Sequence, residues 1–496
     1  MNEREKSDRP VVPVKLPNNA ARAAAEVVEG RGLREGNVVG KTRPGLRAGV
    51  SGSSALDRVR GIAEKDKGAR FTALLHHVDV DRLRAAYWAL NPRAATGVDG
   101  VTWREYGIDL EENLRDLHAR VHRGSYRPKP SRRAYVPKPD GRQRPLGIAA
   151  LEDKLLQRAV VEVLNAVYEA DFLGFSYGFR PGRSPHQALD ALAVAIQHRK
   201  VSWILDADIR GYFEHIDRSW MTRFLEHRIG DRRVLRLVQK WMSAGVIENG
   251  ERVDTLQGTP QGASVSPLLA NVYLHYVFDL WADRWRRLRA RGEVIVVRFA
   301  DDYIVGFQYR DDAERFHTEL RDRLAQFNLE LAAEKTRLIE FGRFAAERRQ
   351  KRGLGKPETF AFLGFTHICA KDRRGRFALR RVTEKKRLRA KLKAIKDELK
   401  RRRHLPVPEQ GQWLERVVRG HCRYYAVPGN IRAVTTFRDQ AQRHWFKALR
   451  RRSQRTDLDW ERMGRLADRW LSPTRILHPW PEQRFHATTR ARSPVR

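Results

Sequence analysis

The sequence predicts a mixed α/β body followed by an all-α, strongly basic domain. Three observations support this fold class. Strand-like and helix-like patterns alternate between residues 126 and 307, whereas the region after residue 371 keeps a helical apolar stripe among many cations. The third observation is size, because 496 residues with 41% apolar content, 12 Trp and 20 Phe suffice for two or three hydrophobic cores.

Composition and periodicity divide the chain into five units. Residues 1–60 mix Pro, Gly, Ala and basic residues without a sustained period, which predicts a flexible basic arm. The remaining units are an N-terminal extension with a first α/β segment at 61–205, a second α/β segment at 206–370, a helical domain at 371–470 and a basic C-terminal tail at 471–496.

The first α/β segment contains a predicted β-hairpin and two predicted helices. In YRPKPSRRAYVPKPDGRQRPLGI (126–148), the tripeptide PDG signals a turn between two basic strands. The apolar spacing of residues 151–170 predicts a helix. Ser184 as N-cap and Pro185 at the first helical position predict a second helix over residues 183–196.

The second α/β segment has predicted strands that carry acidic residues. SWILDADIRGYF (202–213) has a strand pattern, and Ser266–Pro267 predicts the start of another helix. VIVVRFADDYIVGF (294–307) predicts two strands joined by a turn that holds Asp301 and Asp302. Because an unpaired buried carboxylate is strongly unfavourable, this pair requires either a solvent-exposed turn or a cation.

A second acidic pair lies in the predicted strand at 202–213. Asp206 and Asp208 are two positions apart, so their side chains share one face. Alone, each acidic pair has a plain structural explanation as a turn or a strand end. Together, carboxylates from separate strands can hold two divalent ions about 4 Å apart, which activate a hydroxyl and stabilise a leaving pyrophosphate. Asp208 and Asp301 would form this site, with Asp302 pointing differently and contributing less directly.

The net charge points to a polyanionic partner. The chain has 98 Lys and Arg against 60 Asp and Glu, a net charge of +38, and binding to nucleic acid would relieve the resulting self-repulsion. An arginine-rich genome is the alternative explanation, but the cations also cluster over 371–403, on a helix whose apolar stripe is Leu388, Leu392, Ile395 and Leu399. Aromatic and basic residues mix again at 413–427, 435–452 and 460–471. This mixture suits RNA or a hybrid duplex, although about half of these aromatic side chains are expected in a helical core.

Several classes of protein are disfavoured. The chain has no apolar run long enough to cross a bilayer and starts with the charged MNEREKSDRP, so we expect a bacterial cytoplasmic location in association with RNA or the nucleoid. Cys369 and Cys422 are the only cysteines, which excludes a C-x-x-C zinc site and a disulfide framework.

Sequence motifs resemble one known family. RFADDY resembles the acidic box of reverse transcriptases, ADIRGYFEHID resembles their first-aspartate motif, and GTPQGASVSPLLANVYL (258–274) is similar to a segment of group II intron-encoded reverse transcriptase–maturases. Further similar blocks are VPKPDGRQRPLGI, YGFRPGRSPHQAL, LAAEKTRLIEFGR and FLGF. The blocks occur in family order over roughly residues 70–490. The resemblance implies a right-hand polymerase, with fingers ending at residue 205, a palm at 206–370, a reverse transcriptase domain over about 70–370 and a thumb or maturase (X) domain at 371–470.

The resemblance also implies roles for individual residues. Asp208, Asp301 and Asp302 would be catalytic residues and ligands of two Mg²⁺ ions, for which Mn²⁺ is a possible substitute. Nucleotide contacts are expected at Lys138 and Arg144, which suit a triphosphate, at the steric gate Phe213, for which a role as a core aromatic is the alternative, and at Gln261. Template–primer or RNA contacts are expected at Arg180, Arg183, Lys335, Lys385, Lys386, Arg387, Lys391, Arg419, Tyr424 and Tyr425.

The implied function is copying of RNA into DNA, together with binding of the protein's own group II intron RNA to assist splicing and mobility. Expected partners are this RNA, an RNA template with a DNA primer, deoxynucleoside triphosphates and target DNA, with no membrane. Two alternatives are an RNA-binding splicing cofactor with a vestigial polymerase site, and a domesticated or defence-associated reverse transcriptase without an intron. Many relatives end in an H-N-H endonuclease with zinc-ligand cysteines; this chain stops at Arg496 without such a motif, so we expect the short form without endonuclease.

Overall fold

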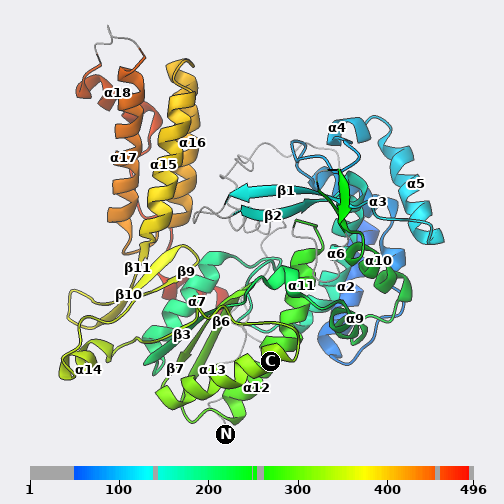
Figure 1. Ribbon diagram of the computed structural model, residues 1–496, viewed down its shortest axis with the longest axis horizontal. Helices are drawn as coiled ribbons and strands as arrows, with labels where there is room; N and C mark the ends of the chain where they lie inside the picture. Colours follow the sequence, from blue (N-terminus) through cyan, green and yellow to red (C-terminus); the bar gives the residue numbers. More distant parts are fainter. Residues whose placement is uncertain (1–49, 138–142, 249, 254–261, 453–457, 491–496) are drawn as a thin grey trace.

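The computed structural model describes residues 50–137, 143–248, 250–253, 262–452 and 458–490 (Figure 1). Residues 1–49 of the predicted arm, as well as Lys138 and Gln261, lie outside the described residues. None of the described helices combines the length and the apolar character that crossing a membrane requires.

The N-terminal helices correct the predicted arm. Helix α2 (Val50–Lys65) covers its last eleven positions, so a flexible arm up to residue 60 is wrong for this part. Leu56, Val59 and Ala63 follow one helical face and are buried in the main core, where α2 packs on α6 (Leu151–Asp171). The extension continues with η1 (Leu75–His77), α3 (Val80–Ala89), α4 (Trp103–Tyr106) and α5 (Leu110–Arg123).

The predicted basic hairpin and the two helices that follow it are confirmed. Strands β1 (Ser131–Pro137) and β2 (Gln143–Ile148) pair antiparallel, and β1 also pairs with β4 (Val246–Glu248), which pairs with β5 (Glu251–Val253). Helix α7 (Pro185–His198) begins with a capping box in which the Ser184 side chain accepts from the Gln187 backbone N–H.

A four-stranded antiparallel sheet in the order β6-β7-β3-β8 forms the centre of the body. Its strands are β3 (Trp203–Asp208), β6 (Val294–Phe299), β7 (Asp302–Phe307) and β8 (Arg337–Glu340). One face packs against helices through residues such as Leu205 and Tyr303 in the main core, whereas Ile204 and Ile304 on the other face belong to a second core. The predicted strand at 202–213 is too long, because Gly211 has a left-handed φ of 53° and α8 (Tyr212–His215) follows.

Helix α13 (Arg310–Ala325) packs on β3 and β7 of this sheet. The main core also includes residues of α9 (Arg218–Glu226), α10 (Arg232–Met242), α11 (Ser266–Leu274) and α12 (Leu280–Leu288). A π-helical turn, η2 (His275–Asp279), joins α11 to α12. The helix predicted to start at Ser266–Pro267 is therefore confirmed at its start, and its geometry changes from α-helical to π-helical after Leu274.

The predicted all-α domain contains a strand. Strands β9 (Phe360–Phe362), β10 (Phe365–Lys371) and β11 (Phe377–Thr383) form an antiparallel sheet, so the helical part begins only at α15 (Lys385–Arg401). The high charge of residues 371–403 hid β11 (FALRRVT), although Arg381 from this strand is buried and donates to Asp190 on α7 at 2.8 Å. Helix α14 (Ala345–Lys351) lies between β8 and β9.

The helices after β11 have a hydrophobic core of their own. Helices α15, α16 (Val407–Tyr425), α17 (Ile431–Arg450) and α18 (Trp460–Trp470) stand together at one end of the molecule, away from the central sheet (Figure 1). Ile395, Leu414, Trp445 and Met463 fill the space between them. This arrangement confirms the apolar stripe predicted for α15.

The predicted basic tail is folded over part of its length. Helix α19 (Pro481–Arg490) packs against α7, and an Arg484 guanidinium nitrogen lies 3.1 Å from an Asp190 carboxylate oxygen. Asp190 thus binds two arginines that are distant in sequence, Arg381 and Arg484. Residues 481–490 therefore pack on the α/β body as a helix.

Candidate active site

The three predicted catalytic carboxylates meet at one end of the central sheet. Asp208 is the last residue of β3, and the register places it directly opposite Asp302, the first residue of β7. Directly opposed residues of an antiparallel pair share one face of the sheet. Asp301 lies in the two-residue turn between the paired Phe299 and Asp302. Residues that are far apart in the chain therefore come together at one sheet end.

The turn that carries Asp301 has an unusual backbone. Ala300, at its first position, has a φ of 57°, a conformation that is costly for a residue with a Cβ atom. A neighbouring loop packs tightly against this turn: a Cβ added to Gly178 would lie 2.3 Å from the Ala300 backbone nitrogen. The Tyr177 backbone N–H donates to the Arg298 carbonyl at 2.8 Å. The surrounding structure therefore holds Ala300 in its conformation.

Burial and mutual repulsion disfavour the ionised form of these carboxyl groups. Burial, followed by the negative charge of Asp208, raises the pKa of Asp301. Burial, followed by Asp206 and Asp301, raises the pKa of Asp302 well above its usual range. Such a group of carboxylates favours a cation, and the structure provides one, because the Lys335 ammonium contacts the Asp208 carboxylate. Lys335, which the sequence predicts at the primer strand, contacts Asp208 in this structure.

These residues fit a divalent ion that also binds phosphate. Within the described ranges, no three His, Cys, Asp or Glu side chains form a preformed metal cluster. Mg²⁺ commonly uses only one or two carboxylates, with water and substrate phosphate oxygens as its other ligands. Asp208 and Asp301 are suitable hard oxygen donors, and Lys335 marks the position where positive charge is favoured.

Comparison with known families agrees with this site. Residues 136–367 match the family described as reverse transcriptase (RNA-dependent DNA polymerase). The matched range contains the end of β1, the whole of β2, the central sheet and all three carboxylates. Residues 136–367 are a reverse transcriptase domain.

Similar proteins include several from introns. The chain is 39% identical to the group II intron-encoded protein LtrA of Lactococcus lactis subsp. cremoris over 222 residues, which are 44% of this chain and 37% of LtrA. It is 34% identical to protein YkfC of Escherichia coli over 200 residues, 40% of this chain and 52% of YkfC. It is 27% identical over 88 residues to nuclear intron maturase 1 of Arabidopsis thaliana, covering 18% of this chain and 12% of that protein. The chain thus spans about half or less of these relatives, and the reverse transcriptase domain resembles those of group II intron proteins.

The predicted nucleotide contacts of the reverse transcriptase domain are placed in part. Arg144 lies on β2 opposite Val136, and its positive charge opposes the rise in the pKa of Asp301 that burial and Asp208 cause. Phe213, on α8, is half-buried and packs beside Tyr212 and the main core. Gly262 has a φ of 108°, which favours glycine. A Cβ atom at this position would lie 2.7 Å from the Gly147 carbonyl oxygen, so the absence of a side chain allows Gly262 to pack closely on β2.

Two predicted RNA contacts are buried and require correction. Arg180 is 3% exposed and donates to the Glu169 carboxylate and to the carbonyls of Leu173 and Ser176. Arg183 is 5% exposed and donates to the Gly174 carbonyl. Both guanidinium groups therefore stabilise the loop before α7 and offer no surface to RNA.

The other predicted RNA contacts lie on or near the C-terminal helices. Lys385, Lys386 and Arg387 are exposed at the start of α15, whereas Lys391 is half-buried and burial lowers its pKa. The Arg419 guanidinium lies 3.2 Å from Glu415 one turn earlier on α16. The remaining two residues pack inward, because the Tyr424 hydroxyl donates to the Leu363 carbonyl at 2.9 Å and the Tyr425 ring lies 5.1 Å from the Phe365 ring.

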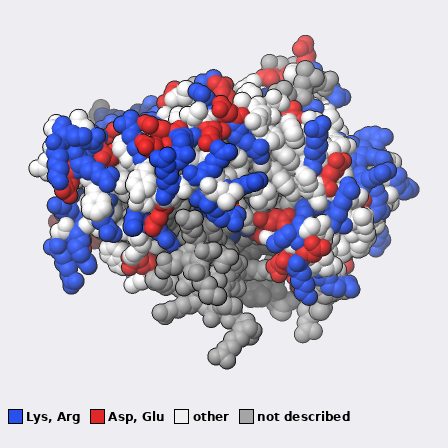
Figure 2. Space-filling model, turned by 90° about the horizontal axis from the view of Figure 1, so that it is seen from below, with Lys and Arg blue, Asp and Glu red and all other residues white. Residues whose placement is uncertain are grey.

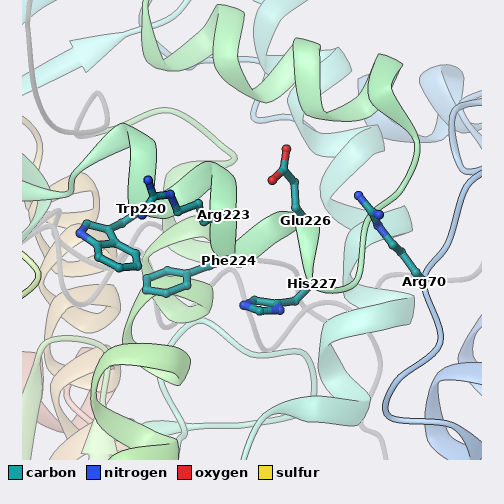
Figure 3. A pocket seen from close by; sticks show the side chains of 6 residues that line it. All are labelled: Arg70, Trp220, Arg223, Phe224, Glu226 and His227. Carbon is teal, nitrogen blue, oxygen red and sulfur yellow. The ribbon is translucent and has the colours of Figure 1, made fainter.

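A surface cleft lies beside α9. It has a volume of about 400 Å³ and is lined by side chains of α9, by His227 directly after this helix and by Arg70 from the segment before η1, as Figure 3 shows: Arg70, Trp220, Arg223, Phe224, Glu226 and His227. None of the predicted site residues lines it. The three candidate catalytic carboxylates therefore lie outside this cleft.

Sequence reasoning missed the residues that hold the acidic turn in place. Arg298 is within the quoted motif RFADDY and is fully buried, bonded to Asp279 and Asn271. A single arginine in an otherwise apolar strand, two positions before Ala300, was the available signal.

Proposed function

We propose that this protein is an RNA-directed DNA polymerase that also binds group II intron RNA. The convergence of Asp208, Asp301 and Asp302 at one sheet end, within the reverse transcriptase domain, is the observation that carries the proposal. The similarity to a group II intron-encoded protein and to an intron maturase supports the RNA partner and a role in splicing and mobility.

The residues of the site suit nucleotidyl transfer by two divalent ions. Asp208 and Asp301 would hold Mg²⁺, or Mn²⁺ in its place, with Asp302 as a further ligand, and the ions would supply charge that activates the primer hydroxyl and stabilises pyrophosphate. Lys335 would leave Asp208 when a metal binds and become available to the primer backbone. Arg144, together with Lys138 outside the described residues, would bind the triphosphate of the incoming nucleotide.

The basic surface suits nucleic acid. Lys and Arg side chains cover much of the face shown in Figure 2 and gather at both ends of it. In α15, the first turn exposes Lys385, Lys386 and Arg387. We assign template–primer, intron RNA and target DNA contacts to the cations of α15, since phosphate neutralisation accounts for most non-specific affinity.

Primer extension by the purified full chain tests the polymerase. We expect deoxynucleotide incorporation on an RNA template with a DNA primer and Mg²⁺, and its loss in Asp301→Asn, which keeps the size of the side chain. Binding of the flanking intron RNA should be nearly equal for both proteins, because the exchange changes one carboxylate at the sheet end. Absence of incorporation by the wild type, with intact intron splicing, would instead support the splicing cofactor with a vestigial site. Incorporation with no intron RNA encoded beside the gene would support the domesticated enzyme.

A further inference from the structure

Arg298 lies inside the protein next to the acidic turn. It stands in β6, two residues before Ala300, and its side chain has 0% exposure. An arginine remains charged in proteins, so its burial requires an acidic partner and full hydrogen bonding. Asp279, at the end of the π-helical turn η2, is the acidic partner and is also 0% exposed.

Every N–H group of the Arg298 side chain has an acceptor. Nε donates to Asp279 Oδ1 at 2.7 Å, and Nη2 donates to Asp279 Oδ2 at 2.5 Å and to Ser176 Oγ at 2.7 Å. Nη1 donates to Asn271 Oδ1 at 3.1 Å and to the Ala300 carbonyl at 2.9 Å. Arginine has five N–H donors in a fixed plane, and all five are used.

The acceptors come from four separate segments. They are the loop before α7, helix α11, the turn η2 and the acidic turn itself. Asn271 also donates through Nδ2 to the Gly178 carbonyl at 2.7 Å, and Gly178 packs against the Ala300 backbone. Arg298 and Asn271 therefore hold the acidic turn in two ways, Arg298 by a bond to the Ala300 carbonyl and Asn271 through the neighbouring loop.

Stability alone does not explain this ion pair. Replacing a buried ion pair by apolar side chains of similar volume is often neutral or stabilising, because both charges lose their hydration. Geometry does explain it, because a lysine has three donors on a single nitrogen and cannot reach the same acceptors in one plane. The fork of Arg298 fixes the left-handed conformation of Ala300 and hence the place from which Asp301 extends.

We propose that Arg298, with Asp279 and Asn271, is a positioning residue that sets the Asp301 carboxylate for metal binding and catalysis. It touches none of the reacting atoms and acts through the Ala300 backbone. The inference rests on the proposed polymerase function for its kinetic consequence, whereas its effect on metal binding can be measured without any DNA synthesis.

Asn271→Ala and Arg298→Lys test the proposal in the full chain. Asn271→Ala removes one acceptor of Arg298 and the bond to Gly178, and Arg298→Lys keeps the charge but loses the fork. We expect roughly tenfold weaker Mn²⁺ binding, measured by electron paramagnetic resonance titration, as is usual when a group that orients a metal ligand is removed. We also expect a lower kcat with an unchanged KM for the nucleotide in primer extension.

Tyr273→Phe is the matched control on the same helix. The buried Tyr273 hydroxyl donates to the Phe327 carbonyl at 2.8 Å, so its removal also breaks a buried hydrogen bond but leaves the acidic turn untouched. This variant should keep the wild-type Mn²⁺ affinity at a comparable loss of melting temperature. If Arg298→Lys does not fold, Ser176→Ala, which removes a single acceptor, takes its place with a smaller expected effect.

The outcomes separate the two proposals. Unchanged Mn²⁺ affinity and kcat in folded Asn271→Ala and Ser176→Ala, with only a lower melting temperature, would overturn the positioning role. A wild type that binds Mn²⁺ but makes no DNA would contradict the polymerase, while weaker Mn²⁺ binding by the variants would still support the positioning role.

Discussion

At the scale of single residues, Phe213 has two possible roles, as a steric gate against ribonucleotides or as an ordinary core aromatic. It lies five positions after Asp208, on α8, and is only half-buried, so part of the ring faces away from the core. If Phe213 excludes the ribose 2′-hydroxyl, Phe213→Ala should allow ribonucleotide incorporation and reduce the ratio of kcat/KM for deoxy over ribo substrates. Competition between the two nucleotides in primer extension measures this ratio.

The control for Phe213 is Phe224, a buried phenylalanine of the main core. Phe224→Ala removes a buried ring from α9 and should lower the melting temperature by more than Phe213→Ala, because the loss of a more deeply buried side chain costs more stability. Its effect on sugar selectivity should be absent. A Phe213→Ala variant with wild-type selectivity and the stability loss of Phe224→Ala would identify Phe213 as an ordinary core residue.

A buried histidine makes stability depend on pH. His367 in β10 is fully buried and stacks on Phe360, and burial, followed by the charge of Arg381, lowers its pKa to about 3 from 6.5. Only the unfolded chain therefore takes up a proton at this histidine as the pH falls below 6.5. His367 keeps its contribution to stability above pH 6.5 and loses it towards pH 3, by up to about 1.4 kcal/mol per pH unit.

His367→Phe should weaken this dependence. Phenylalanine can maintain the stack on Phe360 and takes up no proton. We expect a smaller decrease in melting temperature between pH 7.5 and pH 5.5 than in the wild type. His227 is exposed, and His227→Gln serves as the control. The melting temperature of this variant should decrease over the same pH range by as much as that of the wild type. Equal decreases for His367→Phe and the wild type would show that other groups cause the acid sensitivity.

At the scale of elements, the acidic turn depends on its neighbouring loop. Gly178→Ala would place a Cβ atom 2.3 Å from the Ala300 backbone nitrogen, and neither backbone can yield without moving the turn. Because a displacement of about 1 Å can reduce a rate roughly 100-fold, we expect loss of most primer extension. Single-turnover incorporation rates measure the effect.

Gly464→Ala is the control for this glycine. Gly464 is within α18 with open space around its Cα atom, so alanine should add about 1 kcal/mol of helix stability and leave incorporation unchanged. Wild-type rates in Gly178→Ala would show that the loop and the turn can separate without consequence for the site.

Elements with strong local signals were predictable, and elements that depend on distant partners were not. The capping box at Ser184 and the paired strands β1 and β2 on either side of PDG are determined within a few residues, and both are present at the predicted places. Strand β11 was missed because its charges suggested a surface helix, whereas Arg381 is neutralised by Asp190 on α7. Helix α19 was missed for the same reason, since its Arg484 depends on the same aspartate.

At the scale of the whole molecule, the position of the cations should determine how RNA binding responds to salt. Lys385→Gln with Lys386→Gln removes two exposed charges from the start of α15. Each lost phosphate contact should lower the slope of log affinity against log salt by about 0.7 to 0.9. Filter binding of the intron RNA at several salt concentrations measures the slope.

The matched control removes equal charge from the opposite end of the molecule. Arg284 and Arg289 are exposed on or next to α12, which lies far from α15 (Figure 1). Their replacement by Gln should leave the slope unchanged. Equal slopes for the α15 pair and the wild type would place the RNA surface elsewhere in the molecule.

The chemistry of the site was readable in the local sequence, whereas its assembly required the tertiary structure. Motif order, strand alternation and the acid–base character of Asp208, Asp301 and Asp302 are properties of short segments, so they can be recognised one at a time. The pairing of Asp208 with Asp302, the burial of Arg180 and Arg183, and the five bonds of Arg298 depend on segments far apart in the chain. No local pattern encodes which buried charge meets which partner, because the favourable free energy of that meeting exists only after the chain has packed.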